Sequence, residues 1–154
     1  MYSPSFPCTL SVRALFLALA SSLLAGCASG PYQAKLMVQG GDHLNPTVDT
    51  KPSSVNIRIV QLKKKDAFES ASDDELFSPD LKKQPWVVSY QEAKVRVGLE
   101  REVEIVIQPE VLFLGIVGVF NETDGEWRKV IDVDTLADSK LVFNEYKFSA
   151  EPRQ

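Results

Sequence analysis

The sequence is poor in the side chains that most often carry covalent or metal chemistry. Its 154 residues include two cysteines, Cys8 and Cys27, and a single histidine, His43. Both cysteines lie in an N-terminal segment that we assign below to targeting, so the folded part has no thiol for a disulfide, a metal cluster or a nucleophile. A zinc site usually recruits several His or Cys ligands, and one histidine cannot supply them.

Catalytic motifs are missing as well. The chain has no G-x-S-x-G nucleophile elbow and no glycine-rich phosphate loop. The residue types of a Ser-His-Asp site are all present, so the composition does not exclude one, but no sequence pattern indicates it. We therefore expect a protein that is not an enzyme and that has no cofactor, no metal and no small-molecule substrate.

Excess positive charge is also absent. The chain carries a net charge of −4, and 16 of its 17 basic residues and all 21 acidic residues follow residue 26, so that the remainder carries −5. A mildly acidic domain without a basic stripe argues against nucleic acid as a partner. The 128 of 154 residues that follow residue 26 suit one domain with a single core.

The apolar run near the N-terminus is too short to span a bilayer. Ala14–Ala20, with Leu23 and Leu24 behind it, reaches about half of the ~20 residues that a spanning helix needs. Following the basic Arg13, it matches the apolar core of a secretory signal peptide. A short buried helix or an uncleaved membrane anchor is the alternative interpretation.

The four residues after this run, Leu24-Ala-Gly-Cys27, resemble the lipobox at which lipoprotein signal peptidase cuts. We expect residues 1–26 to be a cleaved signal peptide, Cys27 to be lipidated and residues 27–34 to form a short tether. Two or more acyl chains on Cys27 hold a protein stably on a membrane. By resemblance to sorted lipoproteins, Ala28 in place of Asp favours the outer membrane, with the protein on its periplasmic face.

Residues 35–149 have the pattern of short strands separated by turns. Val55–Leu62 alternates, which is typical of a half-buried strand, and Val111–Phe120 is apolar on both faces, which indicates a central strand. Residues 66–84 show helical spacing instead, and residues 150–154 have the character of a tail. The absence of βαβ alternation predicts an all-β antiparallel sandwich or barrel with a short helical insertion. The other expected strands are Lys35–Gln39, Trp86–Tyr90, Lys94–Leu99, Glu102–Ile107, Trp127–Val133 and Lys140–Phe148.

Two charged clusters have alternative interpretations. Asp73-Asp74-Glu75 could bind a cation, but carboxylates at the start of a helix more often cap it. Lys63-Lys64-Lys65 could contact anionic lipid headgroups, but three charges at the end of a strand are usually just solvated. We favour the structural interpretation of both.

Several stretches, in order along the chain, resemble one family. Val55–Leu62 (VNIRIVQL) is similar to a family strand of the form V-x-V-R-I-Y-Q-L, and an acidic helical stretch ending in Leu76-Phe77 follows it. Leu112–Phe120 (LFLGIVGVF) is similar to a second family strand, and Trp127-Arg128 comes after a turn. Together with the lipobox, these stretches resemble the TssJ (VasD/SciN) lipoproteins of type VI secretion. The resemblance implies a β-sandwich of transthyretin-like topology with a helical insertion.

The resemblance also implies a role. Family members are expected to bind the periplasmic C-terminal domain of TssM and to tether the secretion machine's membrane complex to the outer membrane. The loop between the first two strands is expected to make much of this contact, and here it spans Gly40–Ser54. Leu44 is then the expected apolar anchor of the partner-binding site, which also contains Asp42, His43, Asn45 and Pro46.

A different role remains open at this stage. A periplasm-facing lipoprotein with a sandwich fold could instead bind a glycan or inhibit a hydrolase. A glycan-binding protein would need an aromatic platform, and the candidates for it are Trp86, Tyr90 and Trp127.

Overall fold

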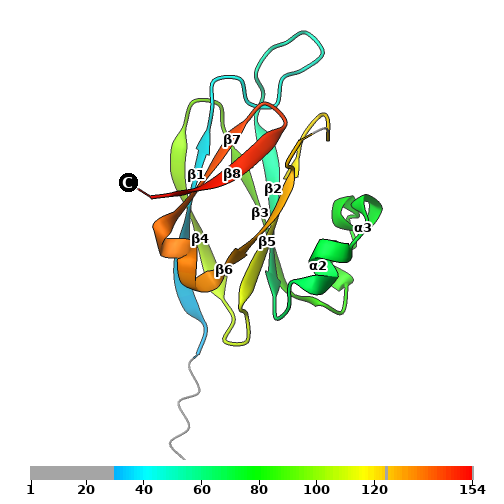
Figure 1. Ribbon diagram of the computed structural model, residues 1–154, viewed down its shortest axis with the longest axis vertical. Coiled ribbons are helices and arrows are strands. Elements are labelled where there is room, and N and C mark those ends of the chain that lie inside the picture. The colour runs from blue at the N-terminus through cyan, green and yellow to red at the C-terminus, as the bar shows by residue number, and fades with distance from the viewer. Residues whose placement is uncertain (1–29, 124, 154) are drawn as a thin grey trace, which may run out of the picture.

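The computed structural model describes residues 30–123 and 125–153, which form a β-sandwich with a helical insertion on one side (Figure 1). The expected signal peptide, residues 1–26, and the expected lipidation site, Cys27, lie outside the described residues. Two four-stranded sheets pack face to face, which confirms the sandwich expected from the sequence.

The first sheet contains both ends of the described chain. Its strands lie in the order β4-β1-β7-β8, and all neighbours are antiparallel except β1 and β7, which are parallel. The strands span Tyr32–Gly40 (β1), Glu100–Ile107 (β4), Ser139–Asn144 (β7) and Lys147–Pro152 (β8).

The second sheet is antiparallel throughout, in the order β3-β2-β5-β6. Its strands span Val55–Leu62 (β2), Val87–Val95 (β3), Phe113–Val119 (β5) and Arg128–Asp132 (β6). Strand β2 has the predicted bounds, and its Val55, Ile57 and Ile59 are buried as the alternation indicates. Strand β5 lies in the interior of its sheet with Leu114–Gly118 buried, which confirms the central strand predicted there.

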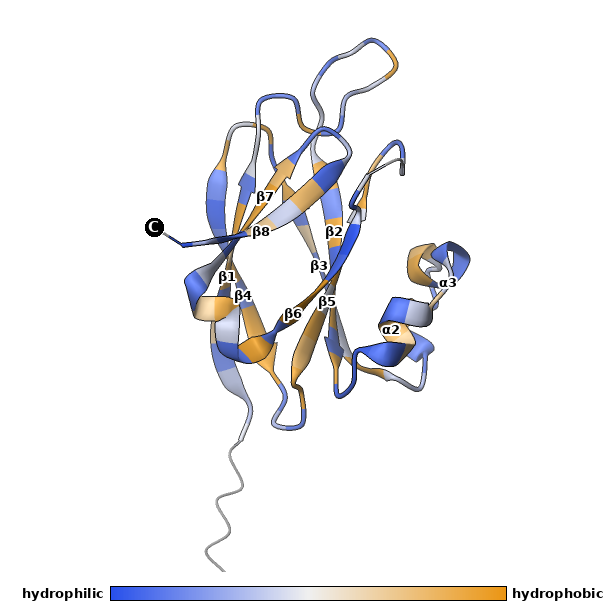
Figure 2. Cartoon of the chain, in the orientation of Figure 1, coloured by the Kyte–Doolittle hydropathy of each residue, from blue (hydrophilic) through white to orange (hydrophobic). Residues whose placement is uncertain are grey.

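The core lies between the sheets and consists almost entirely of aliphatic and phenylalanine side chains. Figure 2 shows hydrophobic residues concentrated on the strands and hydrophilic residues on most of the turns at the two ends. Gln61 is the polar exception within the sandwich. Its Nε2 donates to the Val106 carbonyl oxygen at 2.9 Å, and its Oε1 accepts from the Gln108 backbone N–H at 3.0 Å. This amide joins β2 to the end of β4, and both of its polar groups are satisfied although the side chain is buried.

The helical insertion lies between β2 and β3 and covers the outer face of the second sheet (Figure 1). It contains α2 (Asp66–Ser70), α3 (Asp73–Phe77) and the 3-10 helix η2 (Leu81–Lys83), in agreement with the expected range of residues 66–84. Ser72 and Glu75 form a capping box at the start of α3, in which each side chain bonds the other residue's backbone N–H. The acidic cluster therefore caps a helix, which is the structural interpretation favoured from the sequence.

Aromatic side chains attach the insertion to the sheet. The ring of Phe68 lies directly over Gly115 of β5, where a Cβ atom would overlap it. Phe77 at the end of α3 packs against Trp127, with ring centroids 4.8 Å apart. The outer face of β5 is therefore buried under the insertion, which explains why this strand is apolar on both faces.

Two arginines of the sheet satisfy carbonyl groups of the insertion. Nη1 of Arg58 donates to the carbonyl oxygens of Leu76 at 2.7 Å and Ser78 at 3.0 Å, at the C-terminal end of α3. Nη1 of Arg128 donates to the carbonyl oxygen of Ala71, between α2 and α3, at 2.8 Å. Cations suit these positions, because the last carbonyl groups of a helix have no partner within it.

The structure corrects several expected strand boundaries. Strand β1 begins at Tyr32 instead of Lys35, because Tyr32–Ala34 pair with β4; these three residues are therefore strand and not tether. The two strands expected at Trp86–Tyr90 and Lys94–Leu99 are the single strand β3, which ends in a turn around Gly98 with φ +66°.

At the C-terminus, the single strand expected over Lys140–Phe148 is divided into β7 and β8 by a turn at Glu145, whose φ is 50°. Strand β8 then continues to Pro152, into the residues expected to be a tail. The 3-10 helix η3, Val133–Asp138, which follows β6, was not expected at all.

We predict that Arg58→Met loosens the insertion, because the carbonyl groups of Leu76 and Ser78 lose a charged donor. The free energy of unfolding, measured by urea denaturation, should fall by about 2 kcal/mol, and amide hydrogen exchange should accelerate in α3. The matched control is Arg101→Met, on an exposed position of β4. Equal exchange in the two variants would show that Arg58 does not hold the insertion.

Candidate functional site

The loop of residues 41–54 projects from one end of the sandwich, and β1 begins at the opposite end (Figure 1). We call the first end the loop end and the second the tether end. The connection between β5 and β6 and the turn between β7 and β8 also lie at the loop end. Backbone and side-chain hydrogen bonds join these connections to the base of the loop, as described next.

Leu44, the expected apolar anchor, is not on the surface. Its side chain has 0 % exposure and belongs to the hydrophobic core. The Leu44 backbone is bonded on both sides, since its N–H donates to the Gly41 carbonyl and its carbonyl accepts from the Ser53 N–H at 2.9 Å. The expectation that Leu44 is exposed is therefore wrong, because the chain turns inward here and closes the end of the sandwich with an apolar side chain.

Asn45 holds the base of the loop together. Its backbone N–H donates to the Glu145 carbonyl at 2.8 Å, and its Oδ1 accepts from the Asn121 N–H at 2.7 Å. Its Nδ2 donates to Ser53 Oγ and to the Ser54 carbonyl, each at 3.1 Å. With φ at 44°, Asn45 adopts the left-handed conformation that Asn tolerates better than most residues. One buried residue thus joins both ends of the loop to two other connections, through its side chain to Asn121 and through its backbone to Glu145.

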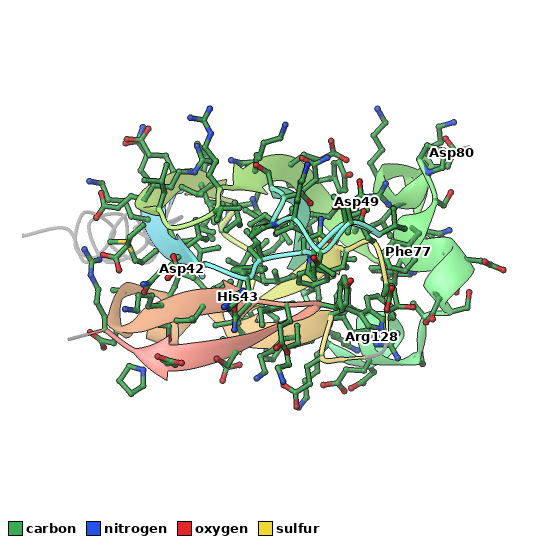
Figure 3. All side chains as sticks on the ribbon, turned by 90° about the horizontal axis from the view of Figure 1, so that it is seen from above. Asp42, His43, Asp49, Phe77, Asp80 and Arg128 are labelled. Carbon is green, nitrogen blue, oxygen red and sulfur yellow. The ribbon has the colours of Figure 1, made fainter. Side chains whose placement is uncertain are left out.

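Pro46 is half-buried and also has a structural role. Its carbonyl oxygen accepts hydrogen bonds from Tyr146 Oη at 3.0 Å and from Asn121 Nδ2 at 3.2 Å. Asp42 and His43 are exposed. Figure 3, which looks down on the loop end, shows both near its middle, with Asp49 toward the side that carries the insertion. Of the five predicted binding residues, only Asp42 and His43 therefore present their side chains fully to a partner.

The tip of the loop is a small turn that presents an apolar side chain. The Thr47 N–H donates to the Lys51 carbonyl at 2.9 Å and the Thr50 N–H to the Thr47 carbonyl at 2.8 Å. Val48, within this turn, is 100 % exposed. The sequence did contain a signal for it, because Val48 and Leu44 are the two large apolar residues of an otherwise polar loop. Nothing local indicated which of the two faces water.

The remaining chemistry of the described residues does not form a catalytic centre at the loop end. The pKa shifts of the structure lie on the outer faces of the sheets. Burial, followed by a hydrogen bond to Glu92, raises the pKa of Tyr90 to about 12, and hydrogen bonds from Lys35 and Arg153 lower the pKa of Glu102. Among residues 30–123 and 125–153, no three His, Cys, Asp or Glu side chains are grouped to hold a metal ion. The longest helix described there, η3, has six residues, too short to cross a bilayer.

The sandwich is shared with a known family of secretion lipoproteins. The T6SS-SciN family model, which describes the type VI secretion lipoproteins that include VasD, EvfM and TssJ, matches residues 32–145. The chain belongs to this family. It is a type VI secretion lipoprotein by family, as the resemblance in its sequence indicated.

Solved structures of type VI secretion proteins have the same fold. The lipoprotein TssJ1 from Pseudomonas aeruginosa is 24% identical with a TM-score of 0.68, covering 80% of this chain and 98% of that one. A chain of a structure described as a type VI membrane complex is 24% identical with a TM-score of 0.70, covering 78% and 98%. A chain of a structure described as the T6SS protein TssM C-terminal domain from EAEC is 23% identical with a TM-score of 0.68, covering 79% and 98%. No functionally curated protein matches the chain in sequence.

We predict that Asn45→Ala lowers the free energy of unfolding by roughly 3 kcal/mol, because it removes the buried side-chain hydrogen bonds and places a Cβ-bearing apolar residue at positive φ. Asn45→Gly loses the same hydrogen bonds without the backbone strain and should be about 1 kcal/mol more stable than Asn45→Ala. Urea denaturation measures both values. Equal stability of the two variants would argue against a strained backbone at this residue.

Proposed function

We propose that this lipoprotein is anchored in the outer membrane through Cys27 and binds the periplasmic C-terminal domain of TssM with its loop end, so that it tethers the type VI membrane complex to the outer membrane. Membership of the type VI secretion lipoprotein family supports the assignment to this machine. The observation that carries the binding role is the tip of the loop, where Val48 is fully exposed above a base that is buried and hydrogen-bonded.

The base of the loop favours binding because it reduces the entropy that association costs. A loop that is already held in one conformation loses little freedom when a partner binds. Asn45 and Pro46 are bonded to the neighbouring connections, and Leu44 closes the core beneath them. In this proposal these three residues position the loop, while Val48, with Asp42 and His43 beside the base, contacts TssM.

The two ends of the domain suit an anchor at one and a partner at the other. Strand β1 starts at the tether end, five residues after Cys27, and the loop projects from the other end (Figure 1). Lipid on Cys27 would confine the protein to the membrane surface, which raises the effective concentration at which a modest interface meets TssM. Ala28 after the cysteine supports the outer membrane, with the domain in the periplasm.

The aromatic platform that a glycan-binding surface would need is not formed by the three candidate residues. Trp127 is buried against Phe77, and Trp86 meets the edge of Phe68 with ring centroids 6.3 Å apart. Tyr90 bonds Glu92 on the sheet. The two tryptophans thus pack against aromatic residues of the insertion and do not form an open platform with Tyr90. We therefore do not propose a glycan-binding or hydrolase-inhibiting role.

We predict that Val48→Asp weakens binding to the periplasmic domain of TssM at least tenfold, about 1.4 kcal/mol, because it places a charge where an apolar contact is expected. The free energy of unfolding should stay within about 0.5 kcal/mol of the wild type, since the side chain touches solvent alone. Titration calorimetry with the detergent-solubilised lipoprotein measures the affinity. Leu112→Asp, at an exposed leucine of the tether end, is the matched control and should bind normally. An unchanged affinity of Val48→Asp would show that the interface does not include the tip of the loop.

We predict that Cys27→Ala removes the protein from the outer membrane and stops secretion while the domain still folds, because the variant lacks the thiol that carries the acyl chains. Membrane fractionation and an assay for secreted effector measure the two results. Cys8→Ala, which removes the other cysteine, should keep both membrane attachment and secretion. Normal secretion by the Cys27→Ala strain would contradict the tethering role.

A further inference from the structure

The tether end carries an unusual share of the exposed apolar surface. Five large hydrophobic side chains are exposed among the described residues, and two of these, Val48 and Leu99, do not lie at the tether end. The other three do: Tyr32 is 49 % exposed, Val106 50 % and Leu112 60 %.

The strand register places these three residues at the same end of the sandwich. Tyr32 is the first residue of β1 and pairs with Ile107, the last residue of β4 and the neighbour of Val106. Leu112 follows the turn after β4, and it lines the same shallow groove as Tyr32 and the exposed Pro109. Tyr32, Pro109 and Leu112 form what is here called the tether-end patch, at the end where the chain enters the domain (Figure 1). Val106 lies at the same end but projects from the opposite face of the first sheet from Tyr32.

Charges beside the tether-end patch are mixed. The exposed Lys63 lies 3.6 Å from Glu110 of the turn after β4, which places the Lys63–Lys65 run at the same end. Asp132 and Asp134 border the groove on its other side. The acidic groups offset the lysines, so the surface has no strong attraction for a highly charged partner. Apolar side chains with a tyrosine and nearby lysines are instead the composition that suits the headgroup region of a bilayer.

The tether determines what this surface can reach. Tyr32 is five residues after Cys27, and each extended residue spans at most about 3.6 Å, so the Cα atom of Tyr32 stays within about 18 Å of that of the acylated residue. Since the acylated residue lies at the lipid headgroups, the bilayer is the large surface that the patch meets most often. High effective concentration makes even a weak apolar contact persistent.

We propose that the tether-end patch rests on the lipid surface of the membrane, with Tyr32 and Leu112 in the headgroup region. The proposal depends on the lipid anchor of the proposed function. Contact at this end directs the long axis of the sandwich away from the bilayer, and the loop of residues 41–54 then faces the periplasm. The membrane thereby orients the domain as well as retaining it.

Spin labels on the lipidated mature protein test this contact, because cleavage after residue 26 removes Cys8 and acylation occupies the thiol of Cys27, so that a single cysteine can be introduced. Leu112→Cys is compared with Leu99→Cys, which has a similar exposure of 52 % but lies away from the tether end. The protein is reconstituted in vesicles of phosphatidylethanolamine with a minor share of phosphatidylglycerol. The ratio of collisions with oxygen to collisions with a water-soluble nickel chelate should be several-fold higher for the label at 112 than for the label at 99. Val106→Cys provides a second, independent label and should resemble Leu112→Cys.

Three results would overturn the inference. Equal collision ratios at 112, 106 and 99 in vesicle-bound protein would show that the domain does not rest on the lipid, while leaving the anchor intact. Protection of position 112 only after the periplasmic domain of TssM is added would assign the patch to that protein. If the lipidated protein does not float with the vesicles, it has no lipid anchor. Both the proposed function and the orientation inferred from it would then be wrong.

Discussion

The hydrogen bonds of the Asn45 side chain are the constraint on which the loop end depends. A single amide bonds Ser53 and Ser54 on the returning side of the loop and Asn121 on the connection between β5 and β6. A buried amide left unpaired is costly, so all of these segments must be in place together. The cost of positive φ at this residue is tolerated for the same reason. The base of the loop is therefore buried in the folded domain, whereas its tip projects into solvent.

The helical insertion lies on the side of the sandwich and leaves its two ends uncovered (Figure 1). It covers the outer face of the second sheet with Phe68 and Phe77 and is held by hydrogen bonds from Arg58 and Arg128. Aromatic side chains that a sequence alone suggests as a binding platform are used for this attachment. The loop end and the tether end are left uncovered by the insertion, and they are the surfaces of the two proposals.

Much of the fold could be predicted because its signals are local. The alternation of β2, the apolar run of β5 and the carboxylates at the start of α3 each lie within a few neighbouring residues, and the structure has all of them. Strand ends were predicted less well. Strand β1 begins early because β4 pairs with it, and β7 is separated from β8 at Glu145, where no glycine marks the turn.

The candidate site, like the fold, could be predicted only where its signals are local. Sequence alone determined that a long polar loop follows the first strand, that Asp42 and His43 lie on it and that His43 is the only histidine of the sequence. Only the tertiary structure decided that Leu44 enters the core and that Val48 faces water. A loop has no periodicity from which burial can be inferred. Its conformation here is determined by bonds to residues 76 and 100 positions further along the chain, and such partners become neighbours only when the sheets assemble.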